Sequence, residues 1–416
     1  MVEQSLLLLP SPPTPANSVS LTAAYRPPLL ATLSILKEQA RNTTLIIAVP
    51  WTSLDGRRGD LPRSQIYNEA QSLLSGLYSL VCRVCAKLEL DVDPDLPGAV
   101  DARILLLEYR PLKQVSSQDL SQDTPSPGIF LDAGPIIDLP TLALSRRGWS
   151  QVFSVEGEPG QTLKGDYVRF ATKTNPLQAK FLMVGGGISL VQYKTSAPIL
   201  PNSSGFFLSH SVVIVGGTFD HLHAGHKLLL TVTAFLLQPV SSNSHVHRRL
   251  IVGITGDELL RNKKYAEYLK SWKQRQNDVV EFLLSILSFS LSASGDAIQT
   301  LSFDSDSSTS GRVVHTILKE CSITIECVEI HDPFGPTITD ESVTALVVSG
   351  ETRAGGQAVN EKRVEKGWKA LEVYEVDVLD AEETEVGTSK TSNFESKISS
   401  TALRKHQADR ARISSL

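Results

Sequence analysis

The stretch VVIVGGTFDHLHAGH, residues 212–226, joins a run of β-branched residues directly to two glycines and then to a cluster of polar side chains. The β-branched run favours a buried strand. Gly216 and Gly217 permit a sharp turn after that strand and leave room for a ligand to approach the backbone. His221, His223 and His226, three of the nine histidines in the chain, follow at once. So many polar groups beside a buried strand indicate a binding site rather than a packing motif.

A helical pattern, AGHKLLLTVTAFLL at 224–237, follows the glycine turn, and we expect the helix to start near Gly225. The first N–H groups of a helix lack partners, and together with the helix dipole they favour an anionic group by about 1–2 kcal/mol. Since His223 and His226 are three residues apart, both imidazoles can face that point. Such donors suit a phosphate group whose charge rises in a transition state.

Two other interpretations of the histidines stay open from the residues alone. In the first, the histidines are ordinary core or surface residues whose hydrogen bonds are made within the protein. In the other, His221, His223 and His226 form a metal triad, although no carboxylate-rich partner segment stands out. Binding of nucleotide phosphates is the interpretation that the pattern favours.

The segments after residue 205 alternate between strand-like and helix-like patterns. The strand-like ranges are 211–217, 248–255, 322–330, 344–350 and 371–379, and the helix-like ranges are 224–237, 276–291, 358–367 and 400–410. This alternation predicts a parallel sheet with helices on both faces. Ligands bind beyond the carboxyl ends of the strands in such sheets, which is where the glycine turn lies.

The first half of the chain also reads as α/β, with strands expected at 44–50 and 102–109 and a helix at 66–90. The polar stretch at 196–205 is a plausible linker. We therefore predict an N-terminal α/β domain of unknown role at 1–200 and a second domain at 205–416. The opening MVEQSLLLLPSPPTP lacks the features of a signal or transit peptide, and we expect a disordered start.

The composition bounds the function. Hydrophobic residues make up 41% and charged residues 20% of the chain, and the formal net charge of −5 argues against a nucleic-acid-binding protein. No apolar run approaches the ~20 residues of a membrane span. The lone pair Cys82 and Cys85 has no second pair to complete a zinc site, which favours reduced thiols and a cytoplasmic location. No GxxxxGK[ST] motif occurs, so a P-loop kinase or ATPase is not expected.

Two further stretches carry groups suited to phosphate. KISSTALR, 397–404, offers the hydroxyl groups of a Ser-Ser-Thr run at a helix start, and Arg404 follows one turn on. GDELLRNKKYAEYLKSWKQR, 256–275, offers Lys263 and Lys264 as cations. The alternatives are an ordinary helix N-cap for the first stretch and a solvated basic helix for the second.

These stretches together resemble the nucleotidylyltransferase superfamily, whose signature is H-x-G-H after a strand and whose second motif is I-S-S-T-x-x-R. The version VGGTFDHLHAGH looks like phosphopantetheine adenylyltransferase of the eukaryotic and archaeal type. DPFGPT, 332–337, and VVSGETRAGGQAVNEKR, 347–363, resemble the same family. The resemblance covers roughly residues 210–410 and implies a C-terminal Rossmann-like parallel sheet of the HIGH-motif type, preceded by the N-terminal α/β domain.

The resemblance implies transfer of AMP from ATP to 4′-phosphopantetheine in coenzyme A biosynthesis, with Mg²⁺ accompanying ATP. The implied catalytic residues are His226, Lys263 and Lys264. The implied ATP-binding residues are Gly217, Phe219, His223, Glu351, Ser399, Ser400, Thr401 and Arg404. The implied phosphopantetheine-binding residues are Thr218, Asn360 and Arg363, and no protein ligand to a metal is implied. We expect the segments around His226 and Ser399 to converge in space.

One position of the sequence departs from the family pattern, and two other functions remain possible interpretations. Relatives often carry an arginine just before the paired glycines, where this chain has Ala354 preceded by Arg353. The second motif of cytidylyltransferases, R-T-x-G-I-S-T-T, is absent, but a cytidylyltransferase or a non-catalytic nucleotide-binding regulator remain the competing interpretations. Without a P-loop in this sequence, we expect the dephospho-coenzyme A kinase to be a separate protein and a partner.

Overall fold

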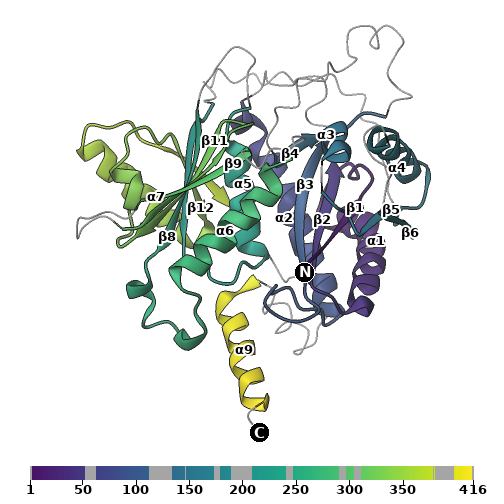
Figure 1. Ribbon diagram of the computed structural model, residues 1–416. Helices are drawn as coiled ribbons and strands as arrows, with labels where there is room; N and C mark the ends of the chain where they lie inside the picture. Colours follow the sequence, from purple (N-terminus) through teal and green to yellow (C-terminus); the bar gives the residue numbers. More distant parts are fainter. Residues whose placement is uncertain are drawn as a thin grey trace, which may run out of the picture.

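The protein contains two β-sheets, each surrounded by helices (Figure 1). The computed structural model describes residues 2–51, 62–111, 134–145, 147–172, 179–188, 209–239, 247–289, 297–303, 311–377, 379 and 398–414. The linker expected at 196–205 lies outside these residues. The α/β class is as predicted, whereas the boundary between two domains stays a prediction.

The first sheet has six strands in the order β4-β3-β2-β1-β5-β6, and every pair is parallel. Its strands are β1 (Glu3–Leu8), β2 (Thr43–Pro50), β3 (Val100–Glu108), β4 (Ile136–Asp138), β5 (Gln151–Val155) and β6 (Lys180–Val184). Its helices are α1 (Ser18–Gln39), η2 (Arg63–Ile66), α2 (Tyr67–Lys87), α3 (Leu139–Leu144) and α4 (Glu158–Ala171). The strands expected at 44–50 and 102–109 and the helix expected at 66–90 match β2, β3 and α2.

The expectation of a disordered start is wrong. The opening residues form β1, which lies between β2 and β5 near the middle of the sheet, and Leu6, Leu7 and Leu8 are completely buried. A run of leucines enclosed on both faces shows no polar alternation, so its pattern alone does not identify it as a strand. The prolines that follow this run end the strand rather than marking disorder.

The second sheet has seven strands in the order β13-β12-β7-β8-β11-β10-β9. The strands are β7 (Val212–Gly217), β8 (Arg248–Thr255), β9 (Ile298–Phe303), β10 (Val313–Leu318), β11 (Ile323–Ile330), β12 (Ala345–Ser349) and β13 (Glu372–Val376). The pairs from β13 to β11 are parallel, as predicted, but β10 runs antiparallel to both β11 and β9. The expectation of a wholly parallel sheet is therefore wrong at this edge, where neither β9 nor β10 was expected.

The helices of the second half are α5 (Ala224–Leu236), η5 (Asp257–Leu260), η6 (Ala266–Tyr268), α6 (Trp272–Leu287), η8 (Gly335–Ile338), η9 (Gly350–Thr352), α7 (Arg353–Glu365) and α9 (Ser400–Ser414). α6 starts four residues earlier than expected because Ser271 and Gln274 form a capping box. The basic stretch is thus divided between η5, η6 and the first turn of α6. None of the helices in the described part of the chain is long and apolar enough to cross a membrane.

Alternating residues of β7 pack on opposite faces of the second sheet. Val213 and Val215 join a hydrophobic core that extends into the first sheet, and Val212 and Ile214 join a smaller core on the side of α7. α5 packs against β7 on one side and against α2 on the other, so it lies between the two sheets. The segment that carries His223 and His226 is therefore held by both halves of the chain.

Candidate functional site

The glycine turn after β7 is shaped by Phe219. The ring of Phe219 is completely buried, and a Cβ atom on Gly217 would lie 3.1 Å from it. A Cβ atom on Gly216 would have no heavy atom within 4 Å, so the backbone there is open. Phe219 and His221 both have left-handed backbone angles, with φ of 51° and 45°. Non-glycine residues seldom adopt left-handed backbone angles, so two of them so close together indicate a strained turn, as is common in functional loops.

His223 and His226 lie together at the N-terminus of α5. His223 occupies the N-cap position, and the two rings stack with centroids 3.9 Å apart and an angle of 23° between planes. The Nδ1 atoms of both are buried and have no hydrogen-bond partner among the described residues. The structure thus places two imidazoles with unused polar atoms beside the unpaired N–H groups of a helix, as the sequence predicted.

Both imidazoles are neutral near pH 7. Burial lowers the pKa of His226 to about 4 and the pKa of His223 well below its usual value, and the positive charges of neighbouring groups lower the pKa of His223 further. A neutral imidazole carries one N–H group, which can donate one hydrogen bond to a phosphate oxygen.

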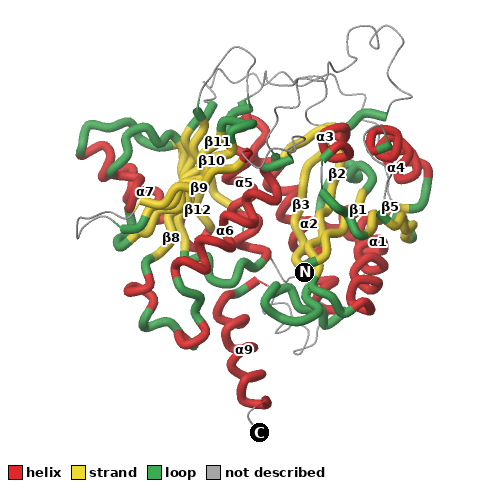
Figure 2. Tube along the Cα trace, viewed as in Figure 1, coloured by secondary structure: helices red, strands yellow, loops and turns green. Residues whose placement is uncertain are grey.

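Asp220 joins the histidine loop to two distant segments. Its completely buried carboxylate contacts Nη1 of Arg404 at 2.5 Å and accepts a hydrogen bond from the backbone N–H of Lys270 at 3.1 Å. Its backbone carbonyl accepts a hydrogen bond from Oγ of Ser400 at 2.7 Å. The segments around His226 and Ser399 therefore converge, and Asp220, which the sequence did not single out, is the residue that connects them. α9 begins at this junction and extends below the two sheets (Figure 2).

Arg404 is fully engaged by protein groups. It is 2% exposed, its Nε donates to the backbone carbonyl of Lys264 at 3.1 Å, and its Nη2 donates to Oγ1 of Thr401 at 3.2 Å. With Nη1 on Asp220, every nitrogen of the guanidinium has a partner. The structure thus assigns Arg404 to holding the two motifs together, and its contact with ATP phosphates stays a prediction.

The remaining residues of the second motif and the basic stretch lie nearby. Oγ of Ser399 accepts a hydrogen bond from the backbone N–H of Ala402 at 3.4 Å, as an N-cap does, and Thr401 is exposed. Lys263 and Lys264 are both exposed, and the carbonyl of Lys264 is bound to the second motif through Arg404. Two exposed lysines are therefore carried by the segment that meets the junction.

Arg275, which sequence reasoning missed, fastens the end of β7 to the end of β8. Its completely buried guanidinium donates to the backbone carbonyls of Thr218 at 2.7 Å, Thr255 at 2.8 Å and Lys270 at 3.0 Å, and it pairs with Asp257 at 2.7 Å. The available signal was the position of this arginine on the apolar face of α6, between buried Trp272 and Val279.

The predicted phosphopantetheine-binding residues on α7 have their polar atoms occupied by backbone groups. Asn360 exchanges hydrogen bonds of 3.0 and 2.8 Å with the backbone of Leu371. Arg363 is 1% exposed and donates to five backbone carbonyls, those of Lys369, Thr337, Asp340, Glu341 and Val343. Both residues fix loops at the edge of the sheet. Arg353 pairs with Glu375, and Glu351 lies in η9 with a side chain outside the described part.

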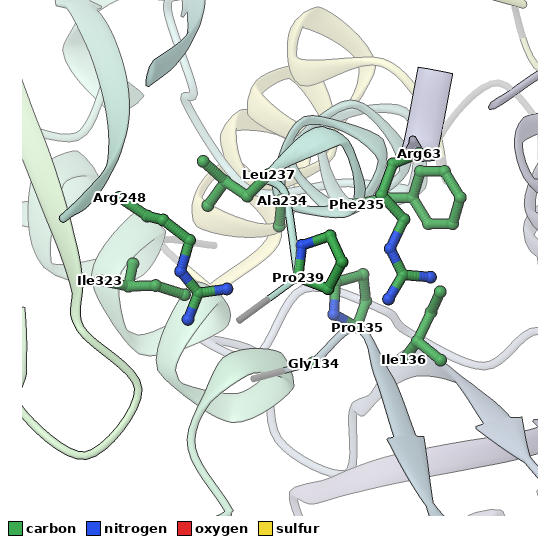
Figure 3. Close-up of a pocket in the computed structure, with 10 residues that line it drawn as sticks. All are labelled: Arg63, Gly134, Pro135, Ile136, Ala234, Phe235, Leu237, Pro239, Arg248 and Ile323. Atoms are coloured by element: carbon green, nitrogen blue, oxygen red, sulfur yellow. The ribbon is translucent and has the colours of Figure 1, made fainter. Parts of the chain in front are cut away.

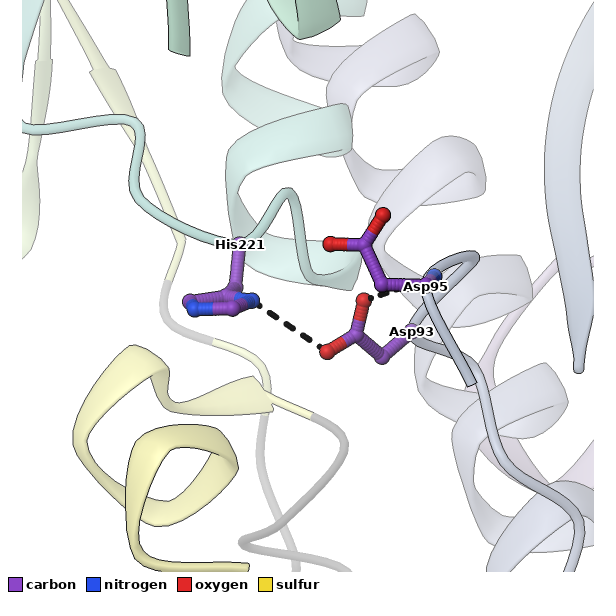
Figure 4. A group of neighbouring side chains, drawn as sticks. All are labelled: Asp93, Asp95 and His221. Atoms are coloured by element: carbon purple, nitrogen blue, oxygen red, sulfur yellow. Dashed lines mark hydrogen bonds and ion pairs between the residues drawn. The ribbon is translucent and has the colours of Figure 1, made fainter. Parts of the chain in front are cut away.

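The metal-triad alternative is not supported, because His221 has no free nitrogen. Its Nδ1 lies 3.2 Å from Asp93 and its Nε2 lies 3.1 Å from the backbone carbonyl of Tyr268. Asp93, Asp95 and His221 form a cluster with metal-ligand spacing (Figure 4). The ammonium group of Lys270 lies 2.6 Å from Asp95, so a side chain already supplies the cation there. The sequence had shown no carboxylate-rich partner for His221, and the structure brings it from the first half of the chain.

A small pocket lies at the opposite end of α5, between the two halves of the chain (Figure 3). Arg63 and Arg248 line it together with apolar residues. Arg248 donates to the backbone carbonyls of Gln238 and Cys321. Because α5 separates this pocket from His223 and His226, it does not belong to the candidate site.

Known proteins resemble parts of the chain. A family model described as "Domain of unknown function (DUF8446)" matches residues 1–190, which include the whole first sheet. An uncharacterized protein of Schizosaccharomyces pombe is 38% identical over 206 residues, 49% of this chain and 51% of that protein. A Saccharomyces cerevisiae protein named phosphopantetheine adenylyltransferase is 34% identical over 44% of this chain and 47% of its own length. The chain thus spans about half the length of these two relatives. A protein of the same name from Thermococcus kodakarensis is 31% identical over 40% of this chain and 74% of its own length.

Proposed function

We propose that the chain, which belongs to the family of the archaeal phosphopantetheine adenylyltransferases, is a pantetheine-phosphate adenylyltransferase. The family is shown by the Thermococcus kodakarensis protein, which is 31% identical to this chain over 74% of its own length. The reaction transfers AMP from ATP to 4′-phosphopantetheine and gives dephospho-coenzyme A and pyrophosphate. The observation that carries the proposal is the junction at Asp220, which joins a helix N-terminus with two unused imidazoles to the second motif.

The chemistry asks for positioning and charge neutralisation. An oxygen of the acceptor phosphate attacks the α-phosphorus of ATP, and the bond from that phosphorus to the oxygen bridging to the β-phosphate breaks, so that pyrophosphate leaves with the bonding electrons. The acceptor is already ionised near neutral pH, so no general base is required. Two polyanions must instead be held in line while hydrogen-bond donors and cations offset their repulsion.

The side chains at the junction fit these roles. His226 donates a hydrogen bond to the α-phosphoryl group, whose charge rises in the transition state, and His223 holds the adjacent phosphates. Thr218 and Lys263 or Lys264 hold the acceptor phosphate, and Ser399 and Thr401 supply hydroxyl donors to ATP. The hydroxyl of Ser400 already donates to the carbonyl of Asp220, so Ser400 would contribute its backbone N–H. The open backbone at Gly216, next to Gly217, leaves space for the nucleotide beside the turn.

Mg²⁺ would accompany ATP and reduce the charge of the triphosphate. Asp220, the buried carboxylate of the histidine loop itself, is already paired with Arg404. We therefore place Mg²⁺ on phosphate oxygens and water rather than on a protein carboxylate.

Release of pyrophosphate tests the proposal. The full chain is incubated with ATP and 4′-phosphopantetheine and, in parallel, with CTP and phosphocholine. We expect pyrophosphate and dephospho-coenzyme A only with the first pair. Turnover with the second pair would identify a cytidylyltransferase, and ATP binding without turnover would identify a non-catalytic regulator.

A further inference from the structure

An acidic segment of the first half contacts every segment of the candidate site. The segment runs from Asp91, in the loop after α2, to Asp101, near the start of β3. It reaches the histidine loop, the first turn of α5, the basic stretch before α6, and α9. Three of them, the histidine loop, the basic stretch and α9, also meet at Asp220.

The contact with α5 is a buried ion pair. Nζ of Lys227, the residue after His226, lies 2.5 Å from Oδ1 of Asp101, and the two side chains are 5% and 7% exposed. Arg103 donates to the other oxygen of Asp101 from Nε at 2.9 Å. Burial alone would raise the pKa of Asp101, but Lys227 and Arg103 hold it at about 2, so the carboxylate stays charged.

The charge of Lys227 requires such a partner. A cation in the first turn of a helix is opposed by the helix dipole, and a buried ammonium group without a counter-charge is costly. Asp101 supplies that counter-charge from the first sheet. The orientation of the turn that carries His226 therefore depends on a residue 126 positions earlier in the chain.

The contact with the histidine loop is a second buried pair. Oδ2 of Asp93 lies 3.2 Å from Nδ1 of His221 and 3.0 Å from Nε2 of Gln407 on α9. His221 has a left-handed backbone angle, and its ring is held between Asp93 and the carbonyl of Tyr268. Asp93 thus fixes the strained part of the loop and α9 at the same time.

Two more exposed contacts flank these pairs. Asp95 contacts Lys270 at 2.6 Å, and Asp91 contacts Arg410 on α9 at 3.4 Å. Lys270 also donates its backbone N–H to Asp220. Exposed pairs contribute little energy, so the two buried pairs carry the connection.

We propose that Asp93 and Asp101 are positioning residues of the adenylyl-transfer site, so that the N-terminal region completes a site whose motifs all lie in the second half. This inference rests on the proposed function. It gives residues 1–190 a role: they hold His226 and the second motif in the geometry that the reaction needs. A misplacement of about 1 Å can lower turnover about 100-fold.

The test uses Asp101→Asn and Asp93→Asn in the full chain. The control is Glu326→Gln, because Glu326 is a buried carboxylate that pairs with the partly exposed Arg249, at 2.6 and 2.7 Å, away from the histidine loop. For the two aspartate variants we expect kcat to fall about 10- to 100-fold with little change in the KM for ATP. The control variant should keep the kcat of the wild type.

Two further measurements separate positioning from loss of stability. In a His226→Ala background, Asp101→Asn should lower kcat by no more than about twofold, because its effect acts through His226. Hydrogen exchange of the amides of 218–230 should accelerate in Asp101→Asn but not in Glu326→Gln. The exchange readout needs no turnover, so it distinguishes failure of this inference from failure of the proposed function.

Additive losses in the double variant, or unchanged exchange of 218–230 in Asp101→Asn, would overturn the positioning role. If the wild-type protein shows no adenylyl transfer, the proposed function is overturned. Faster hydrogen exchange in Asp101→Asn would then still support the positioning of the loop.

Discussion

Replacement of Asp220 by asparagine tests the junction of the site directly. The carboxylate is completely buried and contacts Arg404, whose side chain is 3% exposed, at 2.5 Å. An amide at that position keeps an acceptor for the N–H of Lys270 but removes the negative charge that Arg404 faces. The guanidinium, already bound to Lys264 and Thr401, cannot turn away to solvent without breaking those bonds.

The expected cost follows from the charges. With charge centres about 4 Å apart and an effective dielectric constant of about 20, the lost attraction is about 4 kcal/mol. Removal of one partner of a buried pair typically costs about 3–5 kcal/mol, because the other charge is left uncompensated. We therefore expect Asp220→Asn to lower the free energy of unfolding by about 4 kcal/mol and to lower kcat strongly.

Urea unfolding, followed by circular dichroism, measures the first quantity. Asp220→Leu combined with Arg404→Met serves as the control, since removing both charges leaves none unpaired and should cost less than Asp220→Asn. An exposed pair contributes up to about 1 kcal/mol. If Asp220→Asn lowered the free energy of unfolding by less than that, the junction would not be a buried ionic connection.

Three further predictions concern the histidines, the first sheet and α6. The pKa of His226 is about 4 in the folded protein, below its value in the unfolded chain, so the free energy of unfolding is highest above about pH 6.5 and falls as the pH falls from there toward 4. Urea unfolding at a series of pH values across this range measures that free energy. An equal dependence on pH in His226→Gln would contradict the assignment to His226. Leu7→Ala, in completely buried β1, should cost about 2–5 kcal/mol in urea unfolding, whereas a disordered start predicts no change. Arg275→Met should lower both stability and kcat by releasing the carbonyls of Thr218 and Thr255, and normal kinetics in a folded variant would show that this clamp is not needed.

The second sheet was largely predictable because its parallel strands are continuous apolar runs with helical segments between them. β8 matches its expected range of 248–255, and α5 ends one residue before its expected end. The edge formed by β9 and β10 escaped prediction because Ile298–Phe303 is mostly exposed, and because the sequence VVHTIL of Val313–Leu318 does not alternate between apolar and polar residues although its burial does. Such strands owe their structure to pairing with a neighbour rather than to their own sequence.

The first sheet was harder to predict for local reasons. α1 contains Pro27 and Pro28 in its interior, where proline normally predicts a break, and the buried helix tolerates them. β1 has the leucine content of a targeting segment. In both cases tertiary packing outweighs the local signal.

The candidate site was predictable in its motifs but not in its connections. The positions of His223, His226 and Ser400 followed from short patterns. The pairs Asp220–Arg404 and Asp93–His221 join residues 184 and 128 positions apart, and a single sequence carries no periodicity that links such positions. Arg363 and Asn360 were predicted from a motif to bind a ligand, but their side chains form hydrogen bonds with backbone groups, which the motif does not reveal.

The most direct measurement of the central claim is single-turnover release of pyrophosphate from ATP and 4′-phosphopantetheine by the full chain and by His226→Ala. We expect a rate about 100- to 1000-fold lower in the variant, with nearly unchanged affinity for ATP, because the imidazole acts on charge that develops in the transition state. A variant that releases pyrophosphate at the rate of the wild type would contradict it.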